Sequence, residues 1–276
     1  MDLLEKSQAS QPTQSYTVYV VSLIGPLFGD AERSCENLMN KSLPDFLIIG
    51  VMKAGTTSFY SSLIKHPLIS SAKKKEIHFF DWHYHKGMSW YRDHFVKKKE
   101  GTITGEASDY MWPPHVLQRV YKHLPNVKLI VLLRNPVDRA YSHYQMLRNV
   151  TGGMTFEKAL EKEEKMVKEG KTKHIVYSYL DRGKYVEQLQ RWLKVYPGNQ
   201  ILVIRSEDYF NNPSESLNQT LNFLGLPTQD IELGYIPNKG IYTPMNPSTR
   251  KRLVNYFRPY NQRLYKLLGR NMDWDL

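Results

Sequence analysis

The chain has 276 residues, which is enough for one large domain or two small ones with a substantial hydrophobic core. A hydrophobic content of 41% and a charged content of 24% are typical of a soluble globular protein, and no stretch approaches the roughly 20 apolar residues of a transmembrane helix. The net charge of +11 favours anionic partners such as nucleotides, acidic sugars or acidic protein surfaces, while a single cysteine, Cys35, excludes an intramolecular disulfide and a cysteine-based zinc site.

The first 43 residues differ from the rest. Residues 1–14 are polar and contain Gln, Ser and Pro, which predicts a disordered tail. Residues 15–43 include an apolar stretch, and the sequence assigns this extension no role. The main domain is therefore expected to comprise residues 44–276.

Residues 44–60 combine a strand, a glycine-containing loop and a helix start. The apolar run 46–49 predicts a buried strand, and the loop 50–55 ends it. Thr56, Thr57 and Ser58 are suitable helix N-caps for the amphipathic segment 59–66. Backbone N–H groups and the helix dipole would then face an anion, and Lys53 adds a positive charge. This stretch predicts a phosphate site.

The loop departs from the motif of nucleotide triphosphatases. Gly50 and Gly55 have the G-x-x-x-x-G spacing, but Thr56 stands where that motif requires lysine, and Lys53 precedes the second glycine. An ordinary strand–turn–helix connection explains the loop equally well when it is taken alone.

Strands and helices alternate along the remaining chain. Further strands are predicted at 102–104, 127–133 and 200–205. Helices are predicted at 116–124, after Pro136, and at 156–171, 185–196, 216–224 and 248–268, the last of them broken at Pro259. Near-continuous apolar strands that alternate with helices predict an α/β fold with a central parallel sheet flanked by helices.

Two pairs of residues could add chemistry to the loop. Arg134 ends the strand 127–133 and Ser142 follows eight residues later, so a guanidinium and a hydroxyl could converge on one phosphate. Glu76 and His78 lie two residues apart and would project to the same side of an extended segment, where a carboxylate beside an imidazole suits general-base work. Each also has a plain structural interpretation, as an ion-pair partner or an ordinary helix residue.

Together these stretches resemble the sulfotransferases that use 3′-phosphoadenosine 5′-phosphosulfate (PAPS). The resemblance is to the branch that contains the heparan sulfate N- and 3-O-sulfotransferase domains and their bacterial and polyketide-pathway relatives. Residues 48–57 (IIGVMKAGTT) look like that family's 5′-phosphosulfate loop, residues 75–81 (KEIHFFD) like its catalytic-base segment, and residues 132–142 (LLRNPVDRAYS) like its 3′-phosphate segment. The resemblance continues to the end of the chain and implies a P-loop-like fold.

The resemblance implies a set of roles. Glu76 would be the general base, Lys53 would stabilise the leaving phosphate, and His78 would position the acceptor or tune Glu76. PAPS, the co-substrate, would contact the residues Lys53, Ala54, Gly55, Thr56, Thr57, Ser58, Arg134, Ser142, Lys239 and Gly240. No metal is expected, because lysine, arginine and backbone donors handle the leaving phosphate.

The sequence differs from the pattern of this family at two points that affect the expected acceptor. The animal heparan sulfate enzymes carry a disulfide that one cysteine cannot supply, and Ile241 follows Lys239 and Gly240 where relatives often have arginine. These differences predict a bacterial-type cytoplasmic enzyme, and one cysteine is compatible with a reducing cytosol. The expected acceptor is a glycan or an acyl chain on a carrier protein, with neither nucleic acid nor membrane as a partner.

Two other functions stay open. A nucleotide kinase or NTPase would need lysine after Gly55 and a magnesium-binding aspartate at a strand end, where this chain has Arg134. A non-catalytic polyanion-binding protein would spread its basic residues over a face, whereas the key ones here coincide with strand ends.

Overall fold

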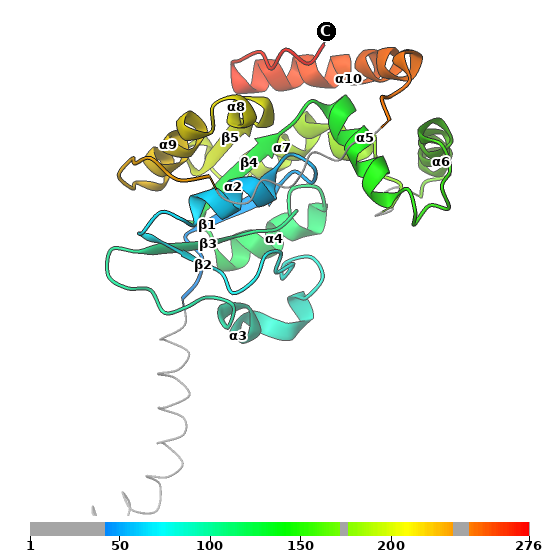
Figure 1. Ribbon diagram of the computed structural model, residues 1–276. Coiled ribbons are helices and arrows are strands. Elements are labelled where there is room, and N and C mark those ends of the chain that lie inside the picture. Colours follow the sequence, from blue (N-terminus) through cyan, green and yellow to red (C-terminus); the bar gives the residue numbers. More distant parts are fainter. Residues whose placement is uncertain (1–41, 172–175, 234–242, 276) are drawn as a thin grey trace, which may run out of the picture. The chain divides into compact units, whose positions relative to one another are not determined.

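The computed structural model describes residues 42–171, 176–233 and 243–275 (Figure 1). The predicted tail 1–14, residues 15–41 of the predicted extension, and the candidate site residues Lys239 and Gly240 lie outside the described residues.

A parallel sheet forms the centre of the domain. Its strands are β1 (Phe46–Gly50), β2 (Ile69–Ser71), β3 (Ile103–Ala107), β4 (Lys128–Leu133) and β5 (Ile201–Arg205). They lie in the order β2-β3-β1-β4-β5, and every neighbouring pair is parallel. The α/β prediction with a central parallel sheet is therefore confirmed.

Helices flank this sheet (Figure 1). They are α2 (Thr56–Leu63), α3 (Gly87–Arg92), α4 (Pro114–His123), α5 (Pro136–Leu147), α6 (Phe156–Lys168), α7 (Tyr185–Leu193), α8 (Ser206–Asn211), α9 (Pro213–Leu224) and α10 (Pro247–Leu268). Short 3₁₀ helices span Tyr84–Lys86, Asp181–Gly183 and Gly198–Gln200. Among the described residues, no helix is long and apolar enough to cross a bilayer.

The central strands β1 and β4 are buried because they are apolar on both faces. All five residues of β1 are buried, as are the last five of β4. Gly105 of β3 leaves room for the ring of Phe46, since a Cβ there would come within 2.5 Å of it. A second apolar cluster joins α5, α6 and α10 through residues that include Tyr144, Leu160 and Phe257. These contacts fix the helix that carries Ser142.

Two predicted features are wrong in detail. The helix 248–268 is not broken, because α10 runs through Pro259. A proline removes the hydrogen bond to the carbonyl four residues earlier, and that residue, Asn255, is exposed, so water can satisfy the freed carbonyl. The strand predicted at 102–104 extends to Ala107, and the edge strand β2 was not predicted.

Candidate active site

The predicted site residues that the structure describes lie near the carboxyl edge of the sheet. β1 lies between β3 and β4, so the loop after Gly50, the turn after Ala107 and Arg134 after β4 are neighbours. The chain leaves β1 toward one side of the sheet and later returns to build the other. Ligands of open α/β sheets bind at such a switch point.

The loop 51–55 folds tightly over the end of β1. The N–H of Val51 donates to the carbonyl of Leu132 at 2.9 Å, and the N–H of Ala54 donates back to Val51 at 3.1 Å. Lys53 and Gly55 both have left-handed backbones, with φ of 74° and 90°. Glycine suits position 55, because residues with a Cβ rarely adopt a φ of 90°.

The amino end of α2 is not capped by a side chain. The predicted N-caps Thr56, Thr57 and Ser58 instead form the first turn of the helix, and Gly55 occupies the N-cap position without a side-chain hydrogen bond. The first helical N–H groups therefore keep their donors available for an anion. The hydroxyl of Ser58 is turned inward, 2.9 Å from the hydroxyl of Tyr209, so only its backbone N–H can serve a ligand at this end.

Two cations lie together at the loop. The guanidinium of Arg134 donates to the carbonyl of Lys53 at 3.0 Å, and burial followed by the charge of Arg134 lowers the pKa of Lys53. The Lys53 ammonium lies 3.8 Å from the sulfur of Met146. Neither cation forms an ion pair with a carboxylate of the described chain. Two adjacent unpaired cations beside open N–H groups make a site for an anion.

Ser142 lies in the second turn of α5 and is 7% exposed. Arg134 precedes this helix by two residues, and in the described chain no hydrogen bond joins it to Ser142.

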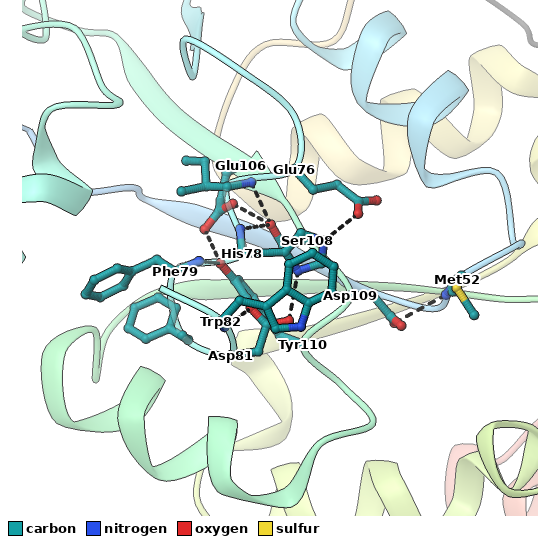
Figure 2. A network of polar contacts seen from close by, with 12 residues as sticks. Met52, Glu76, His78, Phe79, Asp81, Trp82, Glu106, Ser108, Asp109 and Tyr110 are labelled. Atoms are coloured by element: carbon teal, nitrogen blue, oxygen red, sulfur yellow. Dashed lines mark hydrogen bonds and ion pairs between the residues drawn. The ribbon is translucent and has the colours of Figure 1, made fainter. Parts of the chain in front are cut away.

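Glu76 and His78 are in contact, as Figure 2 shows. The His78 Nε2 lies 2.8 Å from the Glu76 carboxylate, and its Nδ1 lies 2.8 Å from that of Asp81. A left-handed backbone at His78, with φ of 52°, creates this geometry instead of the predicted extended segment. The indole of Trp82 stacks on the imidazole, with 3.8 Å between ring centroids.

The charges of this group reinforce one another. Burial favours neutral forms, yet the two carboxylates raise the pKa of His78 to about 9. Burial likewise opposes ionisation of Glu76, but the hydrogen bond from His78 and the charge of Lys75, 2.9 Å away, lower its pKa to about 2. At neutral pH, Glu76 is thus an ionised carboxylate and His78 an imidazolium that donates from both nitrogens.

A buried network fixes the segment that carries Glu76 and His78. The Ser108 hydroxyl accepts from the N–H groups of Ile77 and His78, at 3.1 and 3.2 Å, and donates to Glu106 at 2.8 Å. The hydroxyls of Tyr91 and Tyr110 donate to the other oxygen of Glu106. Burial raises the pKa of Glu106, which is 1% exposed. These contacts, drawn in part in Figure 2, tie β3 to the predicted base segment.

Asp109 connects the loop with a more distant part of the chain. One of its oxygens accepts from the N–H of Met52 at 3.3 Å, and the other pairs with Arg182. Arg182 in turn lies over the ring of Trp112. Sequence reasoning missed Asp109, Arg182, Ser108 and Glu106. The local signal was the group of polar residues Glu106, Ser108 and Asp109 at the end of β3, a strand that the prediction ended at residue 104.

A cavity of about 390 Å³ opens between these groups. Glu76 and His78 line one part of it, and Met52 of the loop and Met146 line another. Because Met146 also contacts the Lys53 ammonium, the cavity lies between the predicted base and the predicted phosphate site. A molecule in the cavity could therefore reach both.

Comparisons with known proteins identify the family of the chain. The chain is 30% identical over 261 residues to human heparan sulfate glucosamine 3-O-sulfotransferase 5, covering 85% of this chain and 75% of that protein. It is 27% identical over 315 residues to the membrane-associated sulfotransferase kil1 of Dictyostelium discoideum, covering 84% of this chain and 66% of that protein. The crystal structure of a sulfotransferase from Alicyclobacillus acidocaldarius superposes with a TM-score of 0.73 at 30% identity, covering 85% of this chain and all of that one. A model of the sulfotransferase domain matches residues 43–245, and this chain belongs to that family of enzymes.

Proposed function

We propose that this enzyme transfers the sulfo group of 3′-phosphoadenosine 5′-phosphosulfate (PAPS) to an acceptor hydroxyl. The observation that carries the proposal is the position of the cavity. Its wall includes the ionised carboxylate of Glu76 and also Met146, whose sulfur lies 3.8 Å from the ammonium of Lys53. An acceptor held there would have a base for its proton and a cation beside the group that leaves sulfur.

The donor would bind along the carboxyl edge of the sheet. Its 5′-phosphosulfate would meet the N–H groups of the loop and of the first turn of α2, from Ala54 and Gly55 to Thr56, Thr57 and Ser58. The uncapped helix end supports this assignment. The 3′-phosphate would meet Arg134 and Ser142. From the family resemblance, Lys239 and Gly240 would close over the nucleotide.

The transfer would be an in-line displacement at sulfur. The acceptor oxygen forms a bond to sulfur while the bond from sulfur to the 5′-phosphate oxygen breaks and its electron pair leaves on that oxygen. Lys53 would neutralise this growing negative charge. The proton of the acceptor hydroxyl would pass to Glu76. A carboxylate of low pKa can accept it because the proton becomes strongly acidic once the oxygen bonds to sulfur.

His78 would keep Glu76 ionised and correctly oriented. Its protonated ring is held between Glu76 and Asp81, so the carboxylate cannot rotate freely or take up a proton from solvent near neutral pH. His78 would thus tune Glu76. Because both residues line the cavity, His78 would also position an acceptor that binds there.

The acceptor is proposed to be a glycan or an acyl chain on a carrier protein. The similarity to a heparan sulfate glucosamine 3-O-sulfotransferase favours transfer to oxygen of a carbohydrate. A cytoplasmic location stays a prediction. A kinase-like reaction is disfavoured, because the strand end where that site needs a magnesium-binding aspartate carries Arg134.

The direct test is incubation with PAPS and a panel of acceptors, comprising glycans, simple alcohols and hydroxyacyl carrier proteins. Mass spectrometry should show one acceptor gaining a sulfo group, together with formation of 3′-phosphoadenosine 5′-phosphate (PAP). A chain that binds ATP with magnesium and transfers phosphate, but does not bind PAP, would refute the proposal.

A further inference from the structure

The cavity beside Glu76 has mostly apolar walls. Side chains that share this character are Trp82, Trp112, Pro113, Pro114, Met146 and Leu147. A cavity of about 150 Å³ can hold a benzene molecule, so about 390 Å³ leaves room for a larger apolar group. A molecule bound in this cavity would gain most of its binding free energy from burying apolar surface.

The charges of the wall are of the opposite sign to the net charge of the chain. Three carboxylates, those of Glu76, Asp81 and Asp109, line the cavity together with the cations Arg182 and His78 and the imidazoles of His115 and His143. Arg182 pairs with Asp109, and His78 pairs with both Glu76 and Asp81. No lysine or arginine of the described wall is therefore left to bind an anionic substituent.

His143 contributes no charge either. It lines the cavity and is 1% exposed. Burial and the nearby guanidinium groups of Arg139 and Arg182 lower its pKa to about 2, so the ring is neutral. An acceptor that carries sulfate or carboxylate groups would meet carboxylates here and would lose water without gaining a counter-charge.

We propose that the acceptor is an uncharged hydroxyl compound with an apolar body, which packs between Trp82, Trp112 and Leu147 with its hydroxyl directed to Glu76. This inference rests on the proposed function and selects among its acceptors. It disfavours a sulfated glycan in the cavity and admits either a free alcohol or an apolar hydroxyacyl chain delivered by a carrier protein.

The first measurement needs no donor nucleotide. Calorimetric titration of the whole chain with 2-naphthol should show binding with a negative heat-capacity change, which is the mark of apolar burial. Leu147→Asp, which places a carboxylate in the wall, should weaken this binding at least tenfold. Val150→Asp adds the same charge at a position that is 71% exposed and outside the wall, and it should change binding less than twofold. Both variants should bind PAP within twofold of the wild type.

The second measurement compares acceptors in the presence of PAPS. The value of kcat/KM should be at least tenfold higher for 2-naphthol or for a 3-hydroxydecanoyl chain on a carrier protein than for a heparan sulfate oligosaccharide, and the better of the first two identifies the source. A preference for the oligosaccharide, absence of naphthol binding, or equal naphthol binding by Leu147→Asp and the wild type would overturn the inference. Failure to bind PAP would instead contradict the donor assignment and leave the naphthol titration interpretable.

Discussion

The imidazole of His78 donates a hydrogen bond to the carboxylate of Glu76 over 2.8 Å while its other nitrogen donates to Asp81. This contact raises the pKa of the histidine to about 9 and lowers that of the glutamate to about 2. The pair is an ionised carboxylate with its own fixed counter-charge.

The stability contributed by His78 should depend on pH. Its pKa is raised in the folded state, so the stabilisation is fully present below about pH 6.5 and is lost as the pH rises through about 9. After discounting for solvent screening, the pH-dependent contribution of His78 to the free energy of unfolding is about 1–2 kcal/mol. Urea unfolding of the wild type and of His78→Gln, at pH 6 and pH 9.5, should show a difference in unfolding free energy that shrinks at the higher pH. An equal difference at both values would contradict the assignment.

Removing either cation of the loop should weaken nucleotide binding. Lys53→Ala and Arg134→Ala each leave the other cation without its neighbour beside the open end of α2, and PAP affinity should fall at least tenfold. Retention on an immobilised 3′-phosphoadenosine nucleotide measures this directly. Lys251→Ala, at an exposed position on α10, is the matched control and should be retained like the wild type. Unchanged retention of both loop variants would remove the binding assignment.

The buried network around Glu106 should act on catalysis from a distance. Glu106→Gln places an amide where the hydroxyl of Ser108 now donates, and one broken buried hydrogen bond costs about 1–3 kcal/mol of folding stability. Because Ser108 holds the N–H groups of Ile77 and His78, kcat should fall while PAP affinity stays within twofold.

The exposed Glu100→Gln supplies the control for this variant and should alter neither stability nor kcat. If Glu106→Gln lost stability but kept its full kcat, the network would be structural only, without an effect on the position of Glu76.

Parts of the fold and site that depend on neighbouring residues could be predicted from the sequence. The strand, loop and helix around Lys53 follow one another within 20 residues, and the run 127–133, apolar apart from Lys128, identifies β4. The contact of Glu76 with His78 was expected on an extended segment, whereas His78 has a left-handed backbone whose N–H donates to Ser108, 30 residues away, and the local sequence does not show that contact.

The site residues that the sequence did not reveal are those whose contacts form only in the folded chain. Glu106 could not be identified as a buried carboxylate, because its three hydroxyl partners belong to Tyr91, Ser108 and Tyr110 and meet it only in the folded chain. Arg182 reaches Asp109 across 73 residues. The strand 102–104 was cut short because Gly105 and Glu106 are poor strand formers, and the close packing of Phe46 on Gly105 overrides that preference.

The central claim is tested most directly by PAP release from PAPS in the presence of an accepted hydroxyl compound, compared between the wild type and Glu76→Gln. The amide keeps the size of the side chain but cannot take up a proton, so the rate should fall by about 10²–10⁴. PAP affinity, measured on the same preparation, should stay within twofold of the wild-type value. Full activity of Glu76→Gln with normal PAP binding would contradict the account.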